Sequence, residues 1–128
     1  MPFRFVVHKD RSRVHATAEE PLTDADLRSY QTALAADPDH GAGFDQLIDL
    51  RGIGGLAVTT LGVQQAGVLT GTFEQHLGGT RCAAIVGSDL TFGMARMFEA
   101  HVPATMEFGV FTNLAEAERW LDREDDEE

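Results

Sequence analysis

From residue 45 onward, short apolar runs alternate with segments of helical periodicity, and this alternation limits the possible folds more than any other feature. The apolar runs occupy residues 45–51 (DQLIDLR), 81–87 (RCAAIVG) and 105–111 (TMEFGVF). Strands joined through a helix run parallel in one sheet, with right-handed crossovers. The 81–87 run is small and apolar on both faces, which is typical of a buried parallel strand. The second half of the chain therefore predicts parallel strands with helices packed against them.

An antiparallel hairpin is predicted at the N-terminus. Phe3, Phe5 and Val7 recur at every second position, and a second alternating run, residues 13–18, follows the polar turn 9–12 (KDRS). Two such runs across a short polar turn are typical of a β-hairpin. The complete expectation is an α/β fold with a five-stranded mixed sheet, in the order β-β-α-β-α-β-α-β-α.

Four helices are expected between and after these strands. The first follows the N-cap candidate Thr23 and ends before Pro38, the second spans about residues 60–77, the third about 88–101, and the fourth follows Asn113. Glycines at three positions of the second helix weaken its prediction. The side chains expected to face the core are Leu27, Tyr30 and Leu34 of the first helix, Leu61, Leu69, Phe73 and Leu77 of the second, Leu90, Met94 and Met97 of the third, and Leu114, Ala117, Trp120 and Leu121 of the fourth.

Charge argues against one class of partner. The chain has 128 residues, about one domain, and a net charge of −11 from 10 basic and 21 acidic residues. Nucleic acid binding is not expected, because phosphates need clustered Lys and Arg. Residues 1–121 are expected to form a single domain, and residues 122–128 (DREDDEE) a disordered acidic tail. Residues 1–13 are locally basic, so transient contact with a membrane surface is the most that is expected.

The expected location is the cytoplasm. No run approaches the roughly 18 apolar residues that a membrane-spanning helix needs. The N-terminus lacks the apolar core of a signal peptide. The single cysteine, Cys82, forms no intrachain disulfide, which fits a reducing compartment.

Motifs for catalysis are weak. The turn at residues 52–57 (GIGGLA) matches G-x-G-x-x-[GA], but the acid that a dinucleotide site needs at the end of the next strand is missing, so a nucleotide-binding enzyme is a minor alternative. Five histidines show no metal-ligand spacing, Cys82 is expected to be buried and inert, and Asp49 with Arg51 is expected to form a surface ion pair. No catalytic residue, metal ligand or cofactor is assigned.

The third expected helix is apolar on more than one side. Its surplus residues are Phe92, Met94, Met97 and Phe98. A helix of this kind is buried, or is covered by a ligand or another subunit, and methionine suits an adaptable contact surface.

Three segments resemble a known family. The strand FDQLIDLR, the segment SDLTFGMARMFEA and the ending VFTNLAEAERWL, together with the order of elements, resemble the SpoIIAA-like family of the STAS superfamily, over about residues 3–121. This fold is similar to the lipid-binding CRAL-TRIO lobe. The resemblance implies two non-enzymatic roles, regulation of a partner protein or binding of a small molecule.

Each implied role has its own candidate residues. In anti-sigma-factor antagonists of this superfamily, a serine at the start of the second helix is phosphorylated, whereas this chain offers only Thr59 and Thr60 there. In the binding role, Phe92, Met94, Met97 and Phe98 would form an apolar wall, with Arg51 and Arg96 for an anionic head group. The leading expectation is a non-catalytic domain, a homodimer, that binds a small apolar or amphipathic, lipid-like ligand or a partner protein. The phosphorylation-switched regulator is the alternative.

Overall fold

The fold is built on one five-stranded sheet, seen in a computed structural model that describes residues 3–19, 22–40, 43–53, 58–72, 81–101 and 107–122. The strands and helices follow one another along the chain as β1 (Phe3–His8), β2 (Arg13–Ala18), α1 (Asp24–Ala36), β3 (Asp45–Asp49), α2 (Thr60–Thr72), β4 (Arg81–Ile85), α4 (Asp89–Glu99), β5 (Glu107–Phe111) and α5 (Leu114–Asp122). This order confirms the predicted α/β fold.

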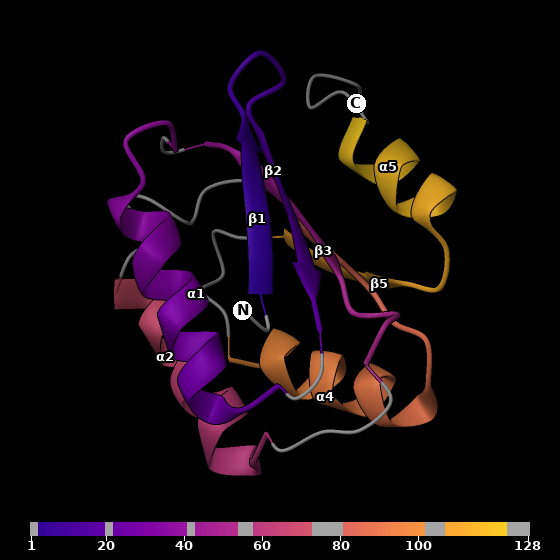
Figure 1. Ribbon diagram of the computed structural model, residues 1–128. Helices are drawn as coiled ribbons and strands as arrows, with labels where there is room; N and C mark the ends of the chain where they lie inside the picture. Colours follow the sequence, from indigo (N-terminus) through magenta and orange to yellow (C-terminus); the bar gives the residue numbers. More distant parts are fainter. Residues whose placement is uncertain are drawn as a thin grey trace.

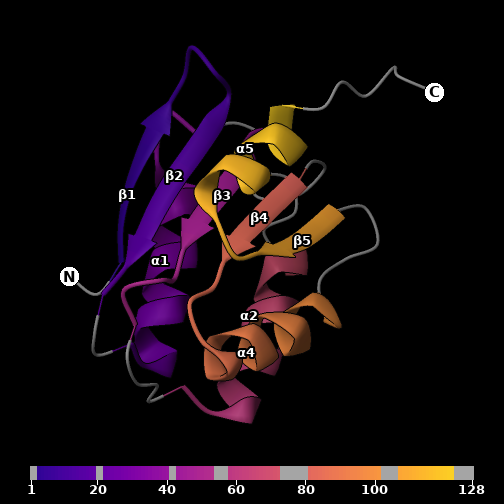
Figure 2. The same ribbon diagram turned by 90° about the vertical axis from the view of Figure 1, so that its right-hand side faces the viewer.

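The five strands lie in the sheet in their sequence order, β1-β2-β3-β4-β5. β1 pairs antiparallel with β2, so that Val7 lies opposite Val14, and the pairs β2–β3, β3–β4 and β4–β5 are all parallel. The predicted hairpin and the predicted parallel strands are both confirmed. α1, α2 and α4 cover one face of the sheet and α5 covers the other (Figures 1 and 2).

Each face of the sheet carries its own apolar core. On the face of α1, α2 and α4, buried side chains from β2 and β4 meet buried side chains from α1 and α4. The residues are Val14, Ala16, Ala18, Leu34, Ala84 and Ala95, with others around them. On the α5 face, the core consists of Leu47, Ala83, Ile85, Ala117 and Leu121, with Phe111, Leu114 and Trp120 packed against it. The predicted inward face of the last helix is confirmed.

Side-chain caps begin α1 and α4 where the sequence predicts. The hydroxyl of Thr23 accepts from the backbone N–H of Asp26 at 3.2 Å, and the carboxylate of Asp26 accepts from the backbone N–H of Thr23 at 2.9 Å. Ser88 and Thr91 form the same reciprocal pair at the start of α4. These capping boxes satisfy backbone donors that the first helical turn leaves without partners.

Two predicted inward positions are wrong. Leu61 of α2 and Leu90 of α4 are 61% and 58% exposed. The buried positions of α2 are Gly62, Val63, Ala66 and Gly67, and the helix makes its contacts with α1 and α4. The core-facing side of α4 also differs from the prediction, since its buried residues are Thr91 and Ala95. Phe73, Leu77 and the predicted end of the second helix lie outside the described residues.

Gly67 allows α2 to approach the end of α4. A methyl group at Gly67 would overlap the Cβ atom of His101 and lie 3.0 Å from its backbone carbonyl. A methyl group at Gly93 of α4 would meet no atom within 4 Å. The close packing of α2 therefore requires a glycine at position 67, despite the low helix propensity of glycine.

These two glycines predict opposite effects of the same substitution. Gly67→Ala is expected to lower the free energy of unfolding by about 1–2 kcal/mol, because the overlap with His101 exceeds the gain in helix propensity. Gly93→Ala is expected to raise it by about 0.5–1 kcal/mol. Urea unfolding monitored by circular dichroism measures both. If Gly67→Ala is as stable as the wild type or more stable, the close contact between α2 and the end of α4 is wrong.

Candidate functional site

An apolar cavity of about 80 Å³ lies between the sheet and the helices α1, α2 and α4. Its walls come from six elements or their ends, three helices and three strands. The lining residues are Leu27, Tyr30, Gln31, Gln46, Ile48, Leu50, Val63, Ala66, Cys82, Ala84, Met94, Ala95, Phe98 and Phe108. A concave, mainly apolar space with a few polar groups is the usual form of a small-molecule site.

Small residues keep this space open. Ala66 of α2, Ala84 of β4 and Ala95 of α4 face it from three sides, and all three are about 2% exposed. α2 is supported by its neighbours α1 and α4 and stands over the sheet without packing onto it closely. Because none of these alanines reaches across the gap, a space remains between the layers.

The amides and the phenol of the cavity wall come from α1 and β3. The hydroxyl of Tyr30 donates to Oε1 of Gln46 at 3.1 Å, and Nε2 of the neighbouring Gln31 donates to the backbone carbonyl of Ala66 at 2.9 Å. All three side chains belong to residues that are at most 7% exposed. Burial raises the pKa of the Tyr30 phenol above its usual range. The wall therefore offers neutral hydrogen-bonding groups within an apolar surface.

Cys82 is the only thiol in the chain, and it belongs to the cavity wall. It is 2% exposed, and burial, assisted by the Asp45 carboxylate, raises the pKa of the thiol from 9.0 to about 12. At neutral pH the side chain is a protonated thiol and a poor nucleophile. The prediction of a buried cysteine is confirmed.

The raised pKa of Cys82 predicts a loss of stability at alkaline pH. The unfolded thiol ionises above about pH 9, whereas the folded thiol stays protonated to about pH 12. The stability that the neutral, buried thiol contributes is therefore complete below about pH 9 and decreases as the pH rises. Between pH 8 and pH 10.5 the wild type is expected to lose about 2 kcal/mol more stability than Cys82→Ala. Urea unfolding at both pH values measures the difference, and equal pH dependence in the two proteins would contradict it.

The structure separates the six residues that the sequence proposed for ligand binding. Met94 and Phe98 line the cavity, as predicted. Phe92 is 46% exposed, and the guanidinium of Arg96 lies 6.0 Å from its ring centre. Met97 is half-buried and is not part of the lining.

Both arginines proposed for an anionic head group have other partners. Arg51 donates to both carboxylate oxygens of Asp49, at 3.0 and 2.8 Å, and Arg96 pairs with Glu99 at 2.9 Å. The hydrogen bonds from Arg51 hold the pKa of Asp49 below its usual range, and Asp49 raises that of Arg51. The predicted surface ion pair of Asp49 and Arg51 is present. Neither Arg51 nor Arg96 lines the cavity.

Sequence reasoning missed most of the wall. Tyr30 and Leu27 appeared only as core positions of the first helix, and Gln31 and Gln46 were not singled out. One signal was available, because Gln46 lies within a strand of otherwise apolar character (FDQLIDLR). A buried amide in such a strand needs a polar partner inside the fold.

The phosphorylation candidates lie at the start of α2. The backbone N–H and the hydroxyl of Thr59 donate to the two carboxylate oxygens of Asp24 at 2.8 and 2.7 Å. These hydrogen bonds hold the pKa of Asp24 below its usual range. A phosphoryl group on Thr59 would place a second negative charge against this carboxylate, which is unfavourable. Thr60 is exposed.

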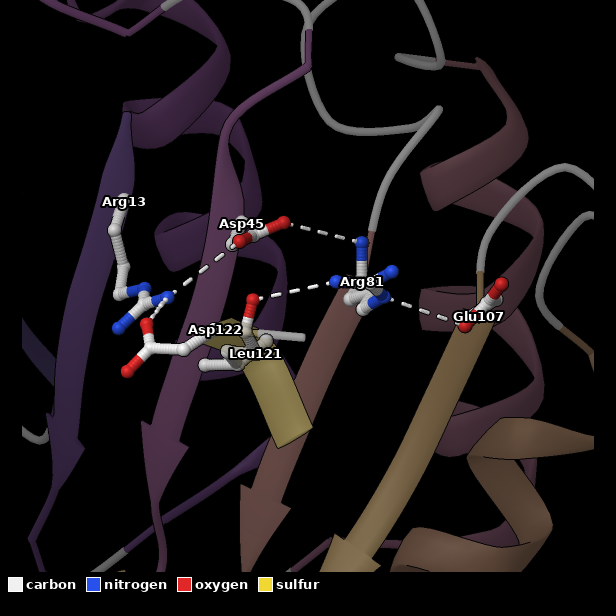
Figure 3. Close-up of polar contacts among 6 residues, drawn as sticks. All are labelled: Arg13, Asp45, Arg81, Glu107, Leu121 and Asp122. Carbon is white, nitrogen blue, oxygen red and sulfur yellow. Dashed lines mark hydrogen bonds and ion pairs between the residues drawn. The ribbon is translucent and has the colours of Figure 1, made fainter. Parts of the chain in front are cut away.

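A row of charged side chains crosses the beginnings of the parallel strands on the α5 face (Figure 3). The strand register places Arg13, Asp45, Arg81 and Glu107 side by side. Nη2 of Arg13 lies 2.7 Å from Oδ1 of Asp122 and 3.7 Å from Oδ2 of Asp45.

The second arginine of this row holds the last turn of α5. Nη1 of Arg81 donates to the backbone carbonyl of Leu121 at 3.3 Å, and its Nε lies 3.5 Å from Oε1 of Glu107. A cation at the C-terminal end of a helix is favoured by the helix dipole. The row therefore anchors α5 to the sheet (Figure 3).

The contact of α5 with the sheet affects two charged residues. Arg13 is only 6% exposed, because α5 reaches it. Asp122 was expected to begin the tail, but it is the last residue of α5 and pairs with Arg13. Residues 123–128 lie outside the described residues.

Two features are absent from the described part of the chain. No three His, Cys, Asp or Glu side chains there are grouped to hold a metal ion. No described helix is long and apolar enough to cross a membrane.

A five-stranded sheet with an N-terminal hairpin, three helices on one face and a C-terminal helix on the other defines the SpoIIAA-like class of α/β fold. The profile of the SpoIIAA-like family matches residues 13–122, and the chain belongs to this family. Its fold is similar to the crystal structure of an uncharacterised DUF3478-family protein with a SpoIIAA-like fold from Shewanella loihica PV-4, with a TM-score of 0.61, 20% sequence identity and 93% of each chain covered. No curated protein matches.

Proposed function

We propose that the chain is a non-catalytic domain that binds a small, mainly apolar molecule in the cavity between its sheet and the helices α1, α2 and α4. The observation that carries this proposal is the cavity itself, with apolar side chains on most of its wall. Burial of apolar ligand surface supplies binding free energy of about 25 cal/mol per Å². The similarity of this fold to the lipid-binding CRAL-TRIO lobe supports the same role.

The size of the cavity limits a lipid-like ligand. An engineered cavity of about 150 Å³ holds one benzene molecule, and the space here is about 80 Å³. The cavity as it stands accommodates a compact molecule or the end of an apolar chain. A longer chain requires α2 to move, and α2 is held mainly by α1 and α4 rather than by the sheet.

Two matched leucine substitutions on α2 test the proposal. Ala66→Leu extends an apolar side chain into the cavity, whereas Gln65→Leu adds the same side chain on the exposed side of the same helix. The full-length wild type and both variants are purified under native conditions from the natural host, and bound small molecules are identified by mass spectrometry. We expect a molecule with the wild type and with Gln65→Leu, and none with Ala66→Leu. No bound molecule in the wild type, or equal amounts in all three, would contradict the proposal.

A homodimer is the second candidate role, supported by exposed apolar residues on α2. Leu61 and Val68 are 61% and 66% exposed, and α2 contains no charged residue. Two copies can therefore meet through α2 without placing like charges together, despite the net charge of −11. Sedimentation equilibrium is expected to show a dimer for the wild type and a monomer for Leu61→Gln/Val68→Gln. A monomeric wild type would remove this candidate.

Cytoplasmic location stays a prediction, tested by fractionation of the host cell.

A further inference from the structure

The cavity wall is uncharged throughout its described residues. Its polar members are two amides, a phenol and a thiol, and the remaining lining residues are aliphatic or aromatic. Arg51 and Arg96, which the sequence suggested for an anionic head group, form ion pairs with Asp49 and Glu99 outside the cavity. An anion that enters this space would leave water without meeting a cation, and that transfer is strongly unfavourable.

Two ionisable groups of the wall are destabilised as anions by the same environment. Burial is the main cause that raises the pKa of both Tyr30 and Cys82, which are neutral when protonated and anionic when ionised. The same desolvation acts on a carboxylate or phosphate of a bound molecule. The geometry alone gives the same answer, since the wall supplies hydrogen-bonding groups but no cation.

The polar groups are concentrated on α1 and the facing strand β3. Tyr30 and Gln46 are linked by a 3.1 Å hydrogen bond, and Gln31 is next to Tyr30 in the chain. A glutamine side chain offers both a donor and an acceptor, and a phenol oxygen that donates its proton still accepts. One side of the cavity therefore matches a neutral polar group, and the rest matches an apolar body.

We propose that the cavity selects a compact, uncharged molecule with one hydrogen-bonding group, such as a hydroxyl, carbonyl or amide, and that it excludes carboxylates and phosphates. This inference rests on the proposed function, whose site it shares. It replaces the anionic head group that the sequence suggested. The volume of about 80 Å³ restricts the part of the molecule inside the protein to a few heavy atoms.

A pair of probes with the same shape tests the exclusion of charge. Isobutyramide and isobutyrate have equal numbers of heavy atoms and differ in charge at pH 7, and xenon serves as a purely apolar probe. Methyl NMR spectra of the full chain report binding through Leu27, Ile48 and Val63, which line the cavity. We expect isobutyramide to bind at least about tenfold more tightly than isobutyrate. We also expect xenon to perturb the same methyl groups.

Tyr30→Phe tests the polar side of the cavity. The variant keeps the ring, which packs edge-on against Phe5 with 5.6 Å between the ring centres. It removes the hydroxyl that donates to Gln46. We expect isobutyramide binding to weaken about fivefold, with xenon binding unchanged. Ser29→Ala, an exposed position next to Tyr30 on α1, is the matched control and is expected to bind both probes as the wild type does.

The outcomes separate this inference from the proposed function. If isobutyrate binds as tightly as isobutyramide, the selection against charge is wrong while the cavity remains a binding site. If xenon binds and neither larger probe does, the polar, compact ligand class is wrong. If no probe, xenon included, perturbs the methyl groups of the cavity, this inference and the proposed function fall together.

Discussion

Phe98→Ala is expected to lower the free energy of unfolding by about 3 kcal/mol and to enlarge the cavity. Phe98 lines the cavity from α4, and its ring centre lies 5.3 Å from that of Phe108 on β5. Removing a phenyl group from a packed core costs its transfer free energy and leaves a void, typically about 3–5 kcal/mol for a fully buried ring. Phe98 is half-buried, which places the expected loss at the lower end.

Phe92→Ala is the matched control on the same helix. Phe92 is 46% exposed, and the Arg96 guanidinium lies 6.0 Å from its ring centre. Its removal is expected to cost less than about 1 kcal/mol, because nearly half of the residue stays exposed to water and an exposed cation–π contact is weak. Urea unfolding measures the stability of both variants, and xenon binding by NMR measures the cavity.

The two variants also differ in the expected effect on binding. The larger space in Phe98→Ala is expected to bind xenon more tightly than the wild type does, although the protein is less stable. Phe92→Ala is expected to bind xenon as the wild type does. Equal losses of stability in the two variants would mean that α4 presents a different side to the sheet, and unchanged xenon binding in Phe98→Ala would mean that its ring does not bound the cavity.

Most of the fold was predictable because its signals are local. The alternation of residues 3–7 and 13–18 defines the hairpin, Thr23 and Ser88 mark where α1 and α4 begin, and the small apolar strand β4 requires cover on both faces. Each of these signals depends on a few neighbouring residues. They survive folding because the tertiary contacts agree with them, as in the capping boxes of α1 and α4.

The orientation of α2 was not predictable from periodicity. Its larger apolar residues suggested that Leu61 faces inward, whereas the structure turns its small residues toward α1 and α4. The reason is close packing, since a methyl group at Gly62 would overlap the carboxylate of Asp24 and one at Gly67 would overlap His101. Helix-to-helix distance is a tertiary property, and a hydrophobic stripe carries no information about it.

The candidate site was predictable only in part for the same reason. Met94 and Phe98 were identified because they make α4 unusually apolar, but Phe92 and Arg96 share that helix and lie outside the cavity. The polar side of the cavity joins α1 to β3 across a sequence separation of 16 residues between Tyr30 and Gln46. Such a pairing depends on how α1 crosses the sheet. That crossing is a tertiary property, so the pairing was not predictable from the sequence alone.

Asp45→Ala is expected to lower the free energy of unfolding by about 3 kcal/mol, because it leaves Arg13 buried with too little negative charge around it. The side chain of Arg13 is 7% exposed and that of Asp45 is 19% exposed, with 3.7 Å between Nη2 and Oδ2. Asp45 also accepts a hydrogen bond from the backbone N–H of Arg81 at 3.4 Å. Removing one partner of a buried ion pair costs about 3–5 kcal/mol, since the remaining charge stays out of water. Asp122 remains beside Arg13 and reduces that loss.

Asp49→Ala on the same strand separates burial from charge. Asp49 pairs with Arg51, whose side chain is 43% exposed, so the loss of Asp49 is expected to cost about 1 kcal/mol or less.

The double variant Arg13→Met/Asp45→Asn removes both charges and keeps an acceptor for the N–H of Arg81. We expect it to be within about 1 kcal/mol of the wild type, because a buried pair is often replaceable by neutral groups of similar size. Urea unfolding of the three variants tests this. If the double variant is less stable than Asp45→Ala, the row stabilises α5 through attraction between its charges, and the cost of a lone buried charge is the wrong explanation.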